Sequence, residues 1–584
     1  MSLPRFLTLS LIVALVGLGW LAYSQQTACD ALFVQHPHLA PSDSIKVGIS
    51  DDPMTGYQHA SLTFAPLTAE DRLTIHSTTS PEATPLLEPP AWQRLQLVAK
   101  GGGIHAQLTL TDGTQQSLTL PAKVTLTTTG QAIKVLNITR KKTIPAYRGE
   151  LQVAVTGNQR LMLINQLPME TYLQAVVPNE LPFRFGAEAV RAQAVAARTY
   201  AIRPRDKVWH EFDICDSQYC QAYYGQQTET PETTAILKET QGLVLLHQGT
   251  PIVALYSSSS GGVSSHYHQA FSDPKTQAFP STPSPYLSVV ADFPETLQPY
   301  LPLSDEGNLL GYLSNKTLPA FDAKSPHYRW ERAFSKAELE AMLPTALGKL
   351  SSDGLTQRWI HPQFKAGQAF GSLKTIQVTQ RGESGQAMSL LIESSTGRWL
   401  IQKEFCIRKA LLKEGKPLPS AMIALQPNEA TGSLANGLTV LGTGFGHGVG
   451  MSQYGASGMH QLGYSFDAIL RHYYPSTQLG SVPLLLHPHT AQSQAVFGLK
   501  GLRPLLHVQV QEAPLFGQAL PRLQHPLWVR LNNQTFSLAP FRGKGRVFDV
   551  QAFWREDQLN TLVWQGQHPQ AKHLKVWLTL EPKA

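Results

Sequence analysis

An alanine-rich segment at residues 187–201 constrains the fold of this chain more than any other stretch. Alanine occupies seven of its fifteen positions, and alanine is the strongest helix former. Val190, Ala194 and Ala197 recur at four- and three-residue steps, which places them on one face of a helix. We therefore expect a helix here whose small side chains let it pack closely against a sheet or another helix.

A glutamate lies just before this helix, at Glu180, between Pro178 and Pro182. Because proline fixes φ and removes a backbone donor, we expect a stiff loop at this point. Apolar neighbours would disfavour the charged carboxylate, and a general acid has to keep its proton near neutral pH. Glu180 is therefore a candidate general acid. An exposed loop glutamate is the alternative, and Glu170 and Glu188 are rival carboxylates.

Most of the remaining chain has the pattern of short β-strands. Residues 45–49, 95–99 and 506–510 form short apolar or alternating runs, and Asp112-Gly113 is a strong hairpin signal. The 44 glycines and 41 prolines among 584 residues indicate many turns between such strands. These features predict an α+β fold, in which a β-rich body with a few helices borders a substrate groove and a C-terminal all-β module follows.

Two further helices are predicted downstream. Ser335 and Glu338 have the spacing of a capping box, which indicates a helix over 335–345. Residues 456–470 have a helical pattern and precede an aromatic stretch that ends in a proline. By contrast, residues 294–323 are rich in Pro, Leu, Asn and Gly and are interpreted as an inserted loop or lid.

The length of the chain predicts several domains. The boundaries that we expect are a signal peptide or N-terminal anchor at 1–24, a tether at 25–44, a main domain at 45–480 and a C-terminal β-rich module at 494–584. Within the main domain we expect a β-rich part at 45–165 and a catalytic core at 145–475.

The N-terminus indicates where the protein is located, and the net charge indicates which partners it can bind. A short basic start and a continuous apolar run at residues 6–23 are typical of an export signal or a membrane anchor. We therefore expect an exported protein, with membrane association at its N-terminus if the segment is not cleaved. The net charge of +7 suits an anionic polymer. No dense Lys/Arg run with interleaved aromatics is present, which argues against nucleic acid.

A glycine-rich segment at 442–456 surrounds His447. Five glycines within nine residues require unusual backbone angles and permit close approach. The lysine of a Walker loop is missing, so a nucleotide loop is excluded. Either His447 is a structural residue, or a sugar polymer lies against the backbone and receives hydrogen bonds from His447 and Gln453. The serine run 257–260 with Gly261-Gly262 is interpreted as a polar loop that lines a groove.

His210, Cys215 and Cys220 are spaced five residues apart. In an exported chain, two cysteines so close together favour a small disulfide loop. The alternative is a zinc site in which water or a fourth side chain completes the coordination.

Four blocks, in this order, resemble the stage II sporulation protein D (SpoIID/LytB) family. They are Tyr172–Glu180, Ala192–Tyr200, Ser258–Gly262 and Gly444–Ala456, and the resemblance covers roughly residues 145–475. It implies a SpoIID-like catalytic body and an exported lytic transglycosylase that cleaves peptidoglycan glycan strands, preferably those stripped of stem peptides. LytB-type relatives imply the alternative of a non-catalytic wall-binding protein or amidase enhancer.

The resemblance also implies roles for individual residues. Glu180 corresponds to the catalytic acid, and the chemistry requires no cofactor. His210, Cys215 and Cys220 become candidate zinc ligands, with a structural or substrate-orienting metal. The partners implied are peptidoglycan glycan strands and an amidase, on the periplasmic or cell-wall side of the membrane. The expected substrate contacts are Tyr172, Arg198, Tyr200, Ser258, Gly261, Gly262, His447, Gln453 and Tyr454.

Overall fold

The computed structural model describes residues 44–51, 56–77, 86, 92–202, 211–217, 219–429 and 432–482. Beyond them it describes 484–486, 494–498, 502–510, 527–532, 534–538, 545–551, 554, 558–564 and 574–582. The chain forms two compact units. The first consists of the described residues of Met1–Glu180, Ala197–Pro251 and Gln478–Ala584, and the second of Leu181–Ala196 and Ile252–Thr477.

The first unit contains two six-stranded sheets. One has the order β12 (Ile214–Cys215), β1 (Ile45–Ile49), β11 (Leu161–Leu167), β10 (Glu150–Val155), β7 (Lys123–Thr128) and β3 (Leu73–Ser77). The other has the order β6 (Gln115–Leu120), β5 (Gly103–Leu110), β4 (Trp92–Lys100), β2 (Leu62–Pro66), β8 (Ile133–Val135) and β9 (Ala146–Tyr147). The predicted hairpin at Asp112-Gly113 is confirmed, because it joins the antiparallel strands β5 and β6.

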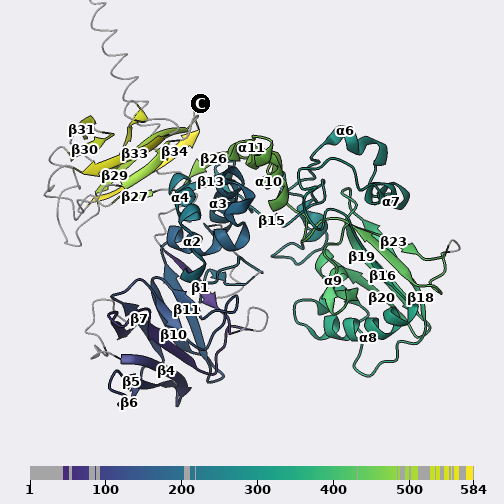
Figure 1. The fold of residues 1–584 in the computed structure, drawn as a ribbon, viewed down its shortest axis with the longest axis horizontal. Helices are drawn as coiled ribbons and strands as arrows, with labels where there is room; N and C mark the ends of the chain where they lie inside the picture. Colours follow the sequence, from purple (N-terminus) through teal and green to yellow (C-terminus); the bar gives the residue numbers. More distant parts are fainter. Residues whose placement is uncertain are drawn as a thin grey trace, which may run out of the picture. The chain divides into compact units, whose positions relative to one another are not determined.

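Two helices and a small sheet complete the body of the first unit. Helices α2 (Met169–Glu180) and α4 (Pro231–Glu239) gather at one end of the strands β1, β10 and β11 (Figure 1). The small sheet has the order β14 (Thr250–Pro251), β13 (Leu243–His247) and β26 (Gln478–Ser481). Tyr172, Leu173 and Val176 form the buried face of α2, so tertiary packing stabilises this helix.

The C-terminal segment consists of strands wherever the structure describes it, as the sequence predicted. Its two four-stranded sheets have the orders β27-β34-β29-β32 and β28-β33-β30-β31. Their bounds are β27 (Leu484–Leu486), β28 (Gln494–Gly498), β29 (Leu502–Val510), β30 (Leu527–Leu531), β31 (Gln534–Leu538), β32 (Gly545–Asp549), β33 (Gln558–Trp564) and β34 (Leu574–Pro582).

The second unit is built around an aromatic and aliphatic core that contains Trp359 and Trp399. Its sheets have the orders β17-β20-β19-β18, β16-β24-β23 and β15-β25. The strands are β15 (Tyr256–Ser257), β16 (Trp330–Phe334), β17 (Ile360–His361), β18 (Leu373–Arg381), β19 (Ala387–Ser394), β20 (Arg398–Gln402), β23 (Ile423–Pro427), β24 (Leu438–Gly442) and β25 (Met451–Ser452), with a small hairpin of β21 (Leu412–Lys413) and β22 (Lys416–Pro417).

The helices of the second unit cover these sheets and connect them. They are α5 (Tyr267–Ala270), α6 (Pro294–Leu297), α7 (Glu306–Ser314), α8 (Lys336–Ser352), α9 (Glu404–Ala410), α10 (Gln453–Gln461) and α11 (Phe466–Tyr473), with the single-turn helix η2 (Phe183–Phe185). The predicted capping box is confirmed, because Ser335 and Glu338 cap α8 reciprocally. The alanine-rich helix is also confirmed as α3 (Ala187–Ile202), which is shared between the two units in sequence.

Three expectations are wrong. Glu180 is not on a loop: it is the last residue of α2, and Pro178 lies inside this helix, because burial of the helix face outweighs the lost backbone bond. Residues 294–323 are not a structureless loop, since α6 and α7 form there. Residues 456–470 form two helices rather than one, because Gly463 adopts φ +85° and Ser465 begins a new helix.

The predicted signal peptide or anchor at 1–24 and all but the last residue of the predicted tether at 25–44 lie outside the described residues. Within the described part of the chain, no helix is both long and apolar enough to span a membrane. The α+β class is confirmed, with many short strands and a separate set of C-terminal sheets. The domain boundaries stay predictions.

Candidate active site

Glu180 ends helix α2 and its carboxylate is fixed by the backbone. The side chain is partly buried, and the Ala222 N–H donates to its Oε1 atom at 2.7 Å. This hydrogen bond fixes the orientation of the carboxyl group at the end of the helix.

Other side chains of the first unit surround this helix end. The Asn179 amide donates to the Ala175 carbonyl at 2.6 Å and so caps the last turn of α2. The Lys141 ammonium donates to Asn179 Oδ1 at 2.7 Å and lies 5.3 Å from the centre of the Tyr224 ring. Burial, and next the charge of Glu180, raise the pKa of the Tyr224 hydroxyl. The carboxyl group is therefore close enough to Tyr224 for their charges to interact.

The segment that holds Glu180 is itself anchored in the core. Gln221 precedes Ala222, and its side chain accepts a hydrogen bond from the Tyr172 hydroxyl at 3.0 Å. The same side chain donates to the Ala197 carbonyl at 3.1 Å. Tyr172 was predicted to contact substrate. Its side chain is fully buried, which does not fit such a contact. It is a positioning residue that fixes the chain beside the Ala222 N–H.

Arg198 was expected to face a cleft, and this expectation is wrong. Its side chain is fully buried and forms a bidentate ion pair with Glu170, with both N–O distances 2.7 Å. Its guanidinium also donates to the Leu243 carbonyl at 3.1 Å. Arg198 therefore ties α3 to α2 and β13, and Glu170 is explained as its structural partner. Tyr200 lies partly buried on α3, and its predicted substrate contact stays a prediction.

In the second unit, the Ser257–Gly262 loop is organised by a buried carboxylate that sequence reasoning missed. Asp322 Oδ2 accepts hydrogen bonds from the N–H groups of Ser260 and Gly261 at 2.8 and 2.7 Å. It also accepts from the hydroxyls of Ser259 and Ser452 at 3.0 and 3.2 Å. Asp322 is fully buried and lies in the segment that was read as a loop. No local pattern marks it, because its donors come from residues far away in the sequence.

The predicted substrate contacts in this loop are largely occupied by the protein itself. The Gly261 carbonyl accepts from the Tyr312 hydroxyl at 2.7 Å, and the Gly262 carbonyl accepts from the Asp292 N–H at 3.0 Å. The Ser258 carbonyl accepts from the Tyr454 N–H at 3.0 Å. Of the three residues, only Ser258 is partly exposed. Gly261 and Gly262 are buried, so they shape the loop instead of contacting a polymer.

The glycine–histidine segment packs against that same serine loop. Ser259 and Phe445 exchange backbone hydrogen bonds at 3.2 and 2.8 Å. A Cβ atom at Gly450, whose φ is +73°, would lie 2.1 Å from the Leu255 carbonyl oxygen. A Cβ atom at Gly444 would lie 2.7 Å from the Ser259 carbonyl oxygen. The glycine density is thus explained by contact between two backbones.

The backbone holds His447 on both sides of its ring. Its Nδ1 accepts the Val449 N–H at 3.1 Å, and the backbone of Tyr256 bonds the other side of the ring. Burial, followed by the charge of Arg408, lowers the pKa of the imidazole to about 4. His447 is therefore neutral at physiological pH, with its proton on Nε2. The structural alternative explains this histidine, and the expected hydrogen bond to a sugar is not supported.

Gln453 and Tyr454 differ in how far their side chains are exposed to solvent. The Gln453 amide is buried and donates to Gln193 Oε1 at 3.3 Å. Tyr454 is partly exposed, and its ring meets that of Phe185 edge-on at 4.9 Å between centroids. Tyr454 therefore remains a candidate for substrate contact within the second unit. The predicted groove between Glu180 and the glycine–histidine segment stays a prediction, because these residues belong to different units.

Cys215 and Cys220 form a disulfide, which is one of the two alternatives that their spacing allowed. A bonded pair offers no thiolate to a metal ion, so the pair in this state does not fit zinc. His210, the third predicted ligand, lies outside the described residues. Among the residues that the structure describes, no cluster of three His, Cys, Asp or Glu side chains suits a metal. Zinc binding stays an untested prediction, and no step below depends on it.

The structure is that of a β-rich α+β protein in which the candidate acid, Glu180, lies at the end of helix α2. Comparison with known proteins is consistent with this class. Residues 157–247 match the family model described as stage II sporulation protein. Residues 273–450 match a domain of unknown function (DUF8618). The chain is therefore similar to the stage II sporulation protein D (SpoIID) family, whose model it matches over residues 157–247.

Three known proteins are each similar to more than half of this chain. Stage II sporulation protein D of Bacillus subtilis (strain 168) is 25% identical over 370 residues, which is 60% of this chain and 82% of the relative. The amidase enhancer of the same organism is 28% identical over 321 residues, which is 53% of this chain but 40% of the relative. An uncharacterized protein of Brachyspira hyodysenteriae is 24% identical over 332 residues, which is 56% of this chain and 70% of the relative.

Proposed function

We propose that this protein is an exported cell-wall enzyme that cleaves the glycan strands of peptidoglycan as a lytic transglycosylase. The family match supports a role connected with the cell wall. The observation that carries the enzymatic part is the setting of Glu180. Its carboxyl group stands at the C-terminal end of α2, partly buried and oriented by the Ala222 N–H at 2.7 Å.

In the proposed reaction, Glu180 first acts as a general acid. It gives its proton to the glycosidic oxygen that follows N-acetylmuramic acid, and the bond between that oxygen and the anomeric carbon breaks. Partial burial and the helix end favour the protonated acid before this step. The Ala222 N–H stabilises the carboxylate that the step leaves behind.

Glu180 then acts as a general base. The carboxylate takes the proton of the sugar's own 6-hydroxyl, and the hydroxyl oxygen bonds to the anomeric carbon. The products are a 1,6-anhydro end and a free 4-hydroxyl, and Glu180 regains its proton. One carboxyl group is sufficient because the nucleophile belongs to the substrate, whereas hydrolysis by a water molecule usually needs a second carboxylate.

A second function is supported by a specific observation. The amidase enhancer of Bacillus subtilis is 28% identical to this chain. In this alternative the protein binds the wall and increases the activity of an amidase, and Glu180 is not needed for chemistry.

The experiment that separates the two functions uses the full chain, the Glu180→Gln variant and a matched control, Glu232→Gln, whose side chain is exposed on α4 of the same unit. Peptidoglycan is stripped of stem peptides beforehand, the amidase is removed, and released fragments are analysed by mass spectrometry. We expect 1,6-anhydro fragments from the wild type and from Glu232→Gln, and none from Glu180→Gln. In a parallel digest of intact peptidoglycan with an added amidase, faster release of stem peptides, equal with all three proteins, would favour the enhancer.

A further inference from the structure

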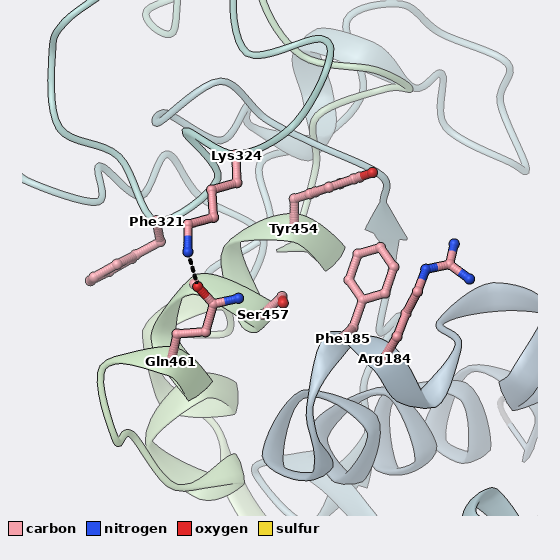
Figure 2. A pocket seen from close by; sticks show the side chains of 8 residues that line it. Arg184, Phe185, Phe321, Lys324, Tyr454, Ser457 and Gln461 are labelled. Atoms are coloured by element: carbon pink, nitrogen blue, oxygen red, sulfur yellow. Dashed lines mark hydrogen bonds between the residues drawn. The ribbon is translucent and has the colours of Figure 1, made fainter.

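The last turn of helix α2 lies where the chain passes from one unit to the other. Glu180 ends both the helix and a segment of the first unit, and Leu181 begins a segment of the second unit. Within the second unit, that segment is fixed by Phe185, whose ring meets the ring of Tyr454 edge-on (Figure 2). Helix ends fray unless other groups hold them. The turn that carries the candidate acid therefore needs contacts within the first unit.

A proline removes one backbone hydrogen bond from this turn. In a regular α-helix the N–H of residue 178 donates to the carbonyl of Gln174, four residues earlier. Pro178 has no N–H to donate. The backbone alone therefore holds the final turn of α2 less firmly than the turns before it, although this turn carries Glu180.

Asn179 supplies side-chain bonds across the same turn. Its amide group donates to the Ala175 carbonyl at 2.6 Å and to Thr228 Oγ1 at 2.8 Å. Thr228 belongs to the single-turn helix η3 (Gln226–Thr228), which contacts α2. Asn179 thus ties the last turn of α2 to the preceding turn and to a neighbouring segment of the first unit.

The side-chain oxygen of Asn179 is held by Lys141, whose ammonium donates to it at 2.7 Å. Lys141 forms a two-residue turn with Lys142, and both have left-handed backbone angles, with φ +47° and +67°. The turn is closed by Arg140 and Thr143, whose backbone groups exchange hydrogen bonds at 2.9 Å. Such turns favour asparagine and glycine, because most residues with a Cβ atom are strained at these angles.

A buried ion pair keeps this strained turn in place. Arg140 donates to Asp216 Oδ2 at 2.7 Å and to the Ser50 carbonyl at 2.6 Å. The side chains of Arg140 and Asp216 are 1% and 0% exposed. Strained backbone persists only where the surrounding structure determines it, and it is common at functional sites. The fold therefore retains a strained lysine, Lys141, whose side chain reaches the turn that carries Glu180.

We propose that Asn179 and Lys141 are positioning residues for Glu180: they offset the backbone bond that Pro178 removes and hold the acid against the Ala222 N–H. The proposal rests on the proposed function for the reaction that it serves. Neither residue transfers a proton, since each acts through the backbone of the turn. Lys141 is exposed, so its bond contributes less than those of Asn179, which is partly buried.

The first test measures the position of the acid and does not depend on cleavage. Amide hydrogen exchange at Ala222 in the full chain, resolved by mass spectrometry, reports how often its bond to Glu180 opens. Asn179→Ala should speed this exchange about 10-fold. Lys141→Asn should speed it about 3-fold, because asparagine tolerates the left-handed turn but is too short to reach Asn179. Lys142→Asn, the matched control at the other exposed position of the turn, should leave the exchange unchanged.

The second test asks whether the bonds of Asn179 offset the bond missing at Pro178. Pro178→Ala restores an N–H that can donate to the Gln174 carbonyl. Asn179→Ala should therefore speed exchange at Ala222 less in the Pro178→Ala background than in the wild type. In the wild-type background, Asn179→Ala should lower kcat for peptide-stripped glycan about 3- to 10-fold and leave KM nearly unchanged, because the position of an acid matters chiefly in the transition state.

Three results would overturn the proposal. They are unchanged exchange at Ala222 in Asn179→Ala and Lys141→Asn, equal effects of Lys141→Asn and Lys142→Asn, and an effect of Asn179→Ala that is the same with and without Pro178. Cleavage of glycan by the wild type together with unchanged exchange in the variants would leave the proposed function intact and remove the positioning role. Absence of cleavage together with the expected exchange would do the reverse, so the two failures are distinguishable.

Discussion

The end of helix α2 and the pair of loops at 257–262 and 442–452 use polar groups in opposite ways. At the helix end, the Glu180 carboxyl group is only partly buried and is held at one oxygen by the Ala222 N–H. In the two loops, the polar groups bind one another. Asp322 accepts hydrogen bonds from five donors, and His447 is bonded on both sides of its ring. The loop pair has the denser sequence signature, yet most of its groups are committed to the fold.

The comparison shows that a segment with a recognisable sequence motif does not necessarily hold polar groups that can act on a substrate. The glycines and serines of the loops are needed because two backbones lie in contact there. Glu180 has a weak local signature, but its side chain is partly buried and accepts a hydrogen bond from the Ala222 N–H. We therefore propose that the helix end carries the chemistry and that the loops are structural.

The largest effect is expected at Glu180. The Glu180→Gln variant keeps an oxygen that can accept the Ala222 N–H, but it has no proton to transfer. The rate of glycan cleavage should fall about 10³-fold, within the range for loss of a general acid–base group, while the melting temperature stays close to that of the wild type. The rate is measured as release of soluble fragments from peptide-stripped peptidoglycan. A rate within tenfold of wild type would remove Glu180 from the mechanism.

The next effect concerns stability and tests the loops. Asp322→Ala leaves the buried N–H groups of Ser260 and Gly261 without their acceptor. We expect the free energy of unfolding of the second unit to fall by about 3–5 kcal/mol, as for other buried hydrogen-bonded charges. Denaturant unfolding and amide exchange at Ser260 and Gly261 measure this loss. Asp322→Asn is the matched control, since it retains an acceptor oxygen and should cost less. An unchanged stability in Asp322→Ala would contradict the structural role.

A pH effect is expected from Asp292, which lies near these loops in the second unit. The pKa of this carboxyl group is raised to about 6, mainly by burial; the hydrogen bond to His472 opposes the shift and the charge of Asp322 adds to it. The folded state therefore binds the proton more tightly than the unfolded state. This contribution is full below pH 4 and is lost as the pH rises from about 4 to about 6, with a total of about 3 kcal/mol.

The measurement for Asp292 is a set of unfolding curves between pH 4 and pH 7 for the wild type and Asp292→Asn. The difference in stability between the two proteins should change across this window and be constant above it. A difference that does not depend on pH would show that Asp292 has no raised pKa.

The smallest effect is expected at the disulfide, which precedes the segment that holds Glu180. Cys220 lies two residues before Ala222. Cys215→Ser should destabilise the first unit by about 2 kcal/mol, according to the loop-entropy estimate for a short loop. Thermal unfolding with and without reductant measures the effect, and mass spectrometry of the wild type should show two fewer protons than the reduced chain. Stoichiometric zinc on a reduced pair would instead support the metal site.

Much of the fold was accessible from the sequence, because it depends on local patterns. The alanine spacing of α3, the capping box of α8 and the turn between β5 and β6 are all short-range features, and the structure has them. The helix that carries Glu180 was missed because Pro178 argues locally against a helix. There the burial of Tyr172, Leu173 and Val176 decided the outcome.

The candidate site was harder to predict from the sequence, because the residues that contact one another there are far apart in the chain. Asp322 was missed since its partners lie about 60 to 130 residues away, and nothing nearby marks a buried carboxylate. Arg198 was placed on the wrong side of α3, because helical spacing does not say which face meets the Glu170 carboxylate. For His447 the sequence left a structural role and a sugar contact open, and its bonds to the backbone favour the structural role.

The central claim is that Glu180 moves one proton out and back while the substrate provides its own nucleophile. The most direct test is digestion of peptide-stripped glycan strands in water labelled with heavy oxygen, followed by mass spectrometry of the new ends. The account predicts 1,6-anhydro ends without label from the wild type and no new ends from Glu180→Gln. Labelled reducing ends would show that water is the nucleophile, and unlabelled anhydro ends from Glu180→Gln at the wild-type rate would show that another group carries the proton; either result would contradict the account.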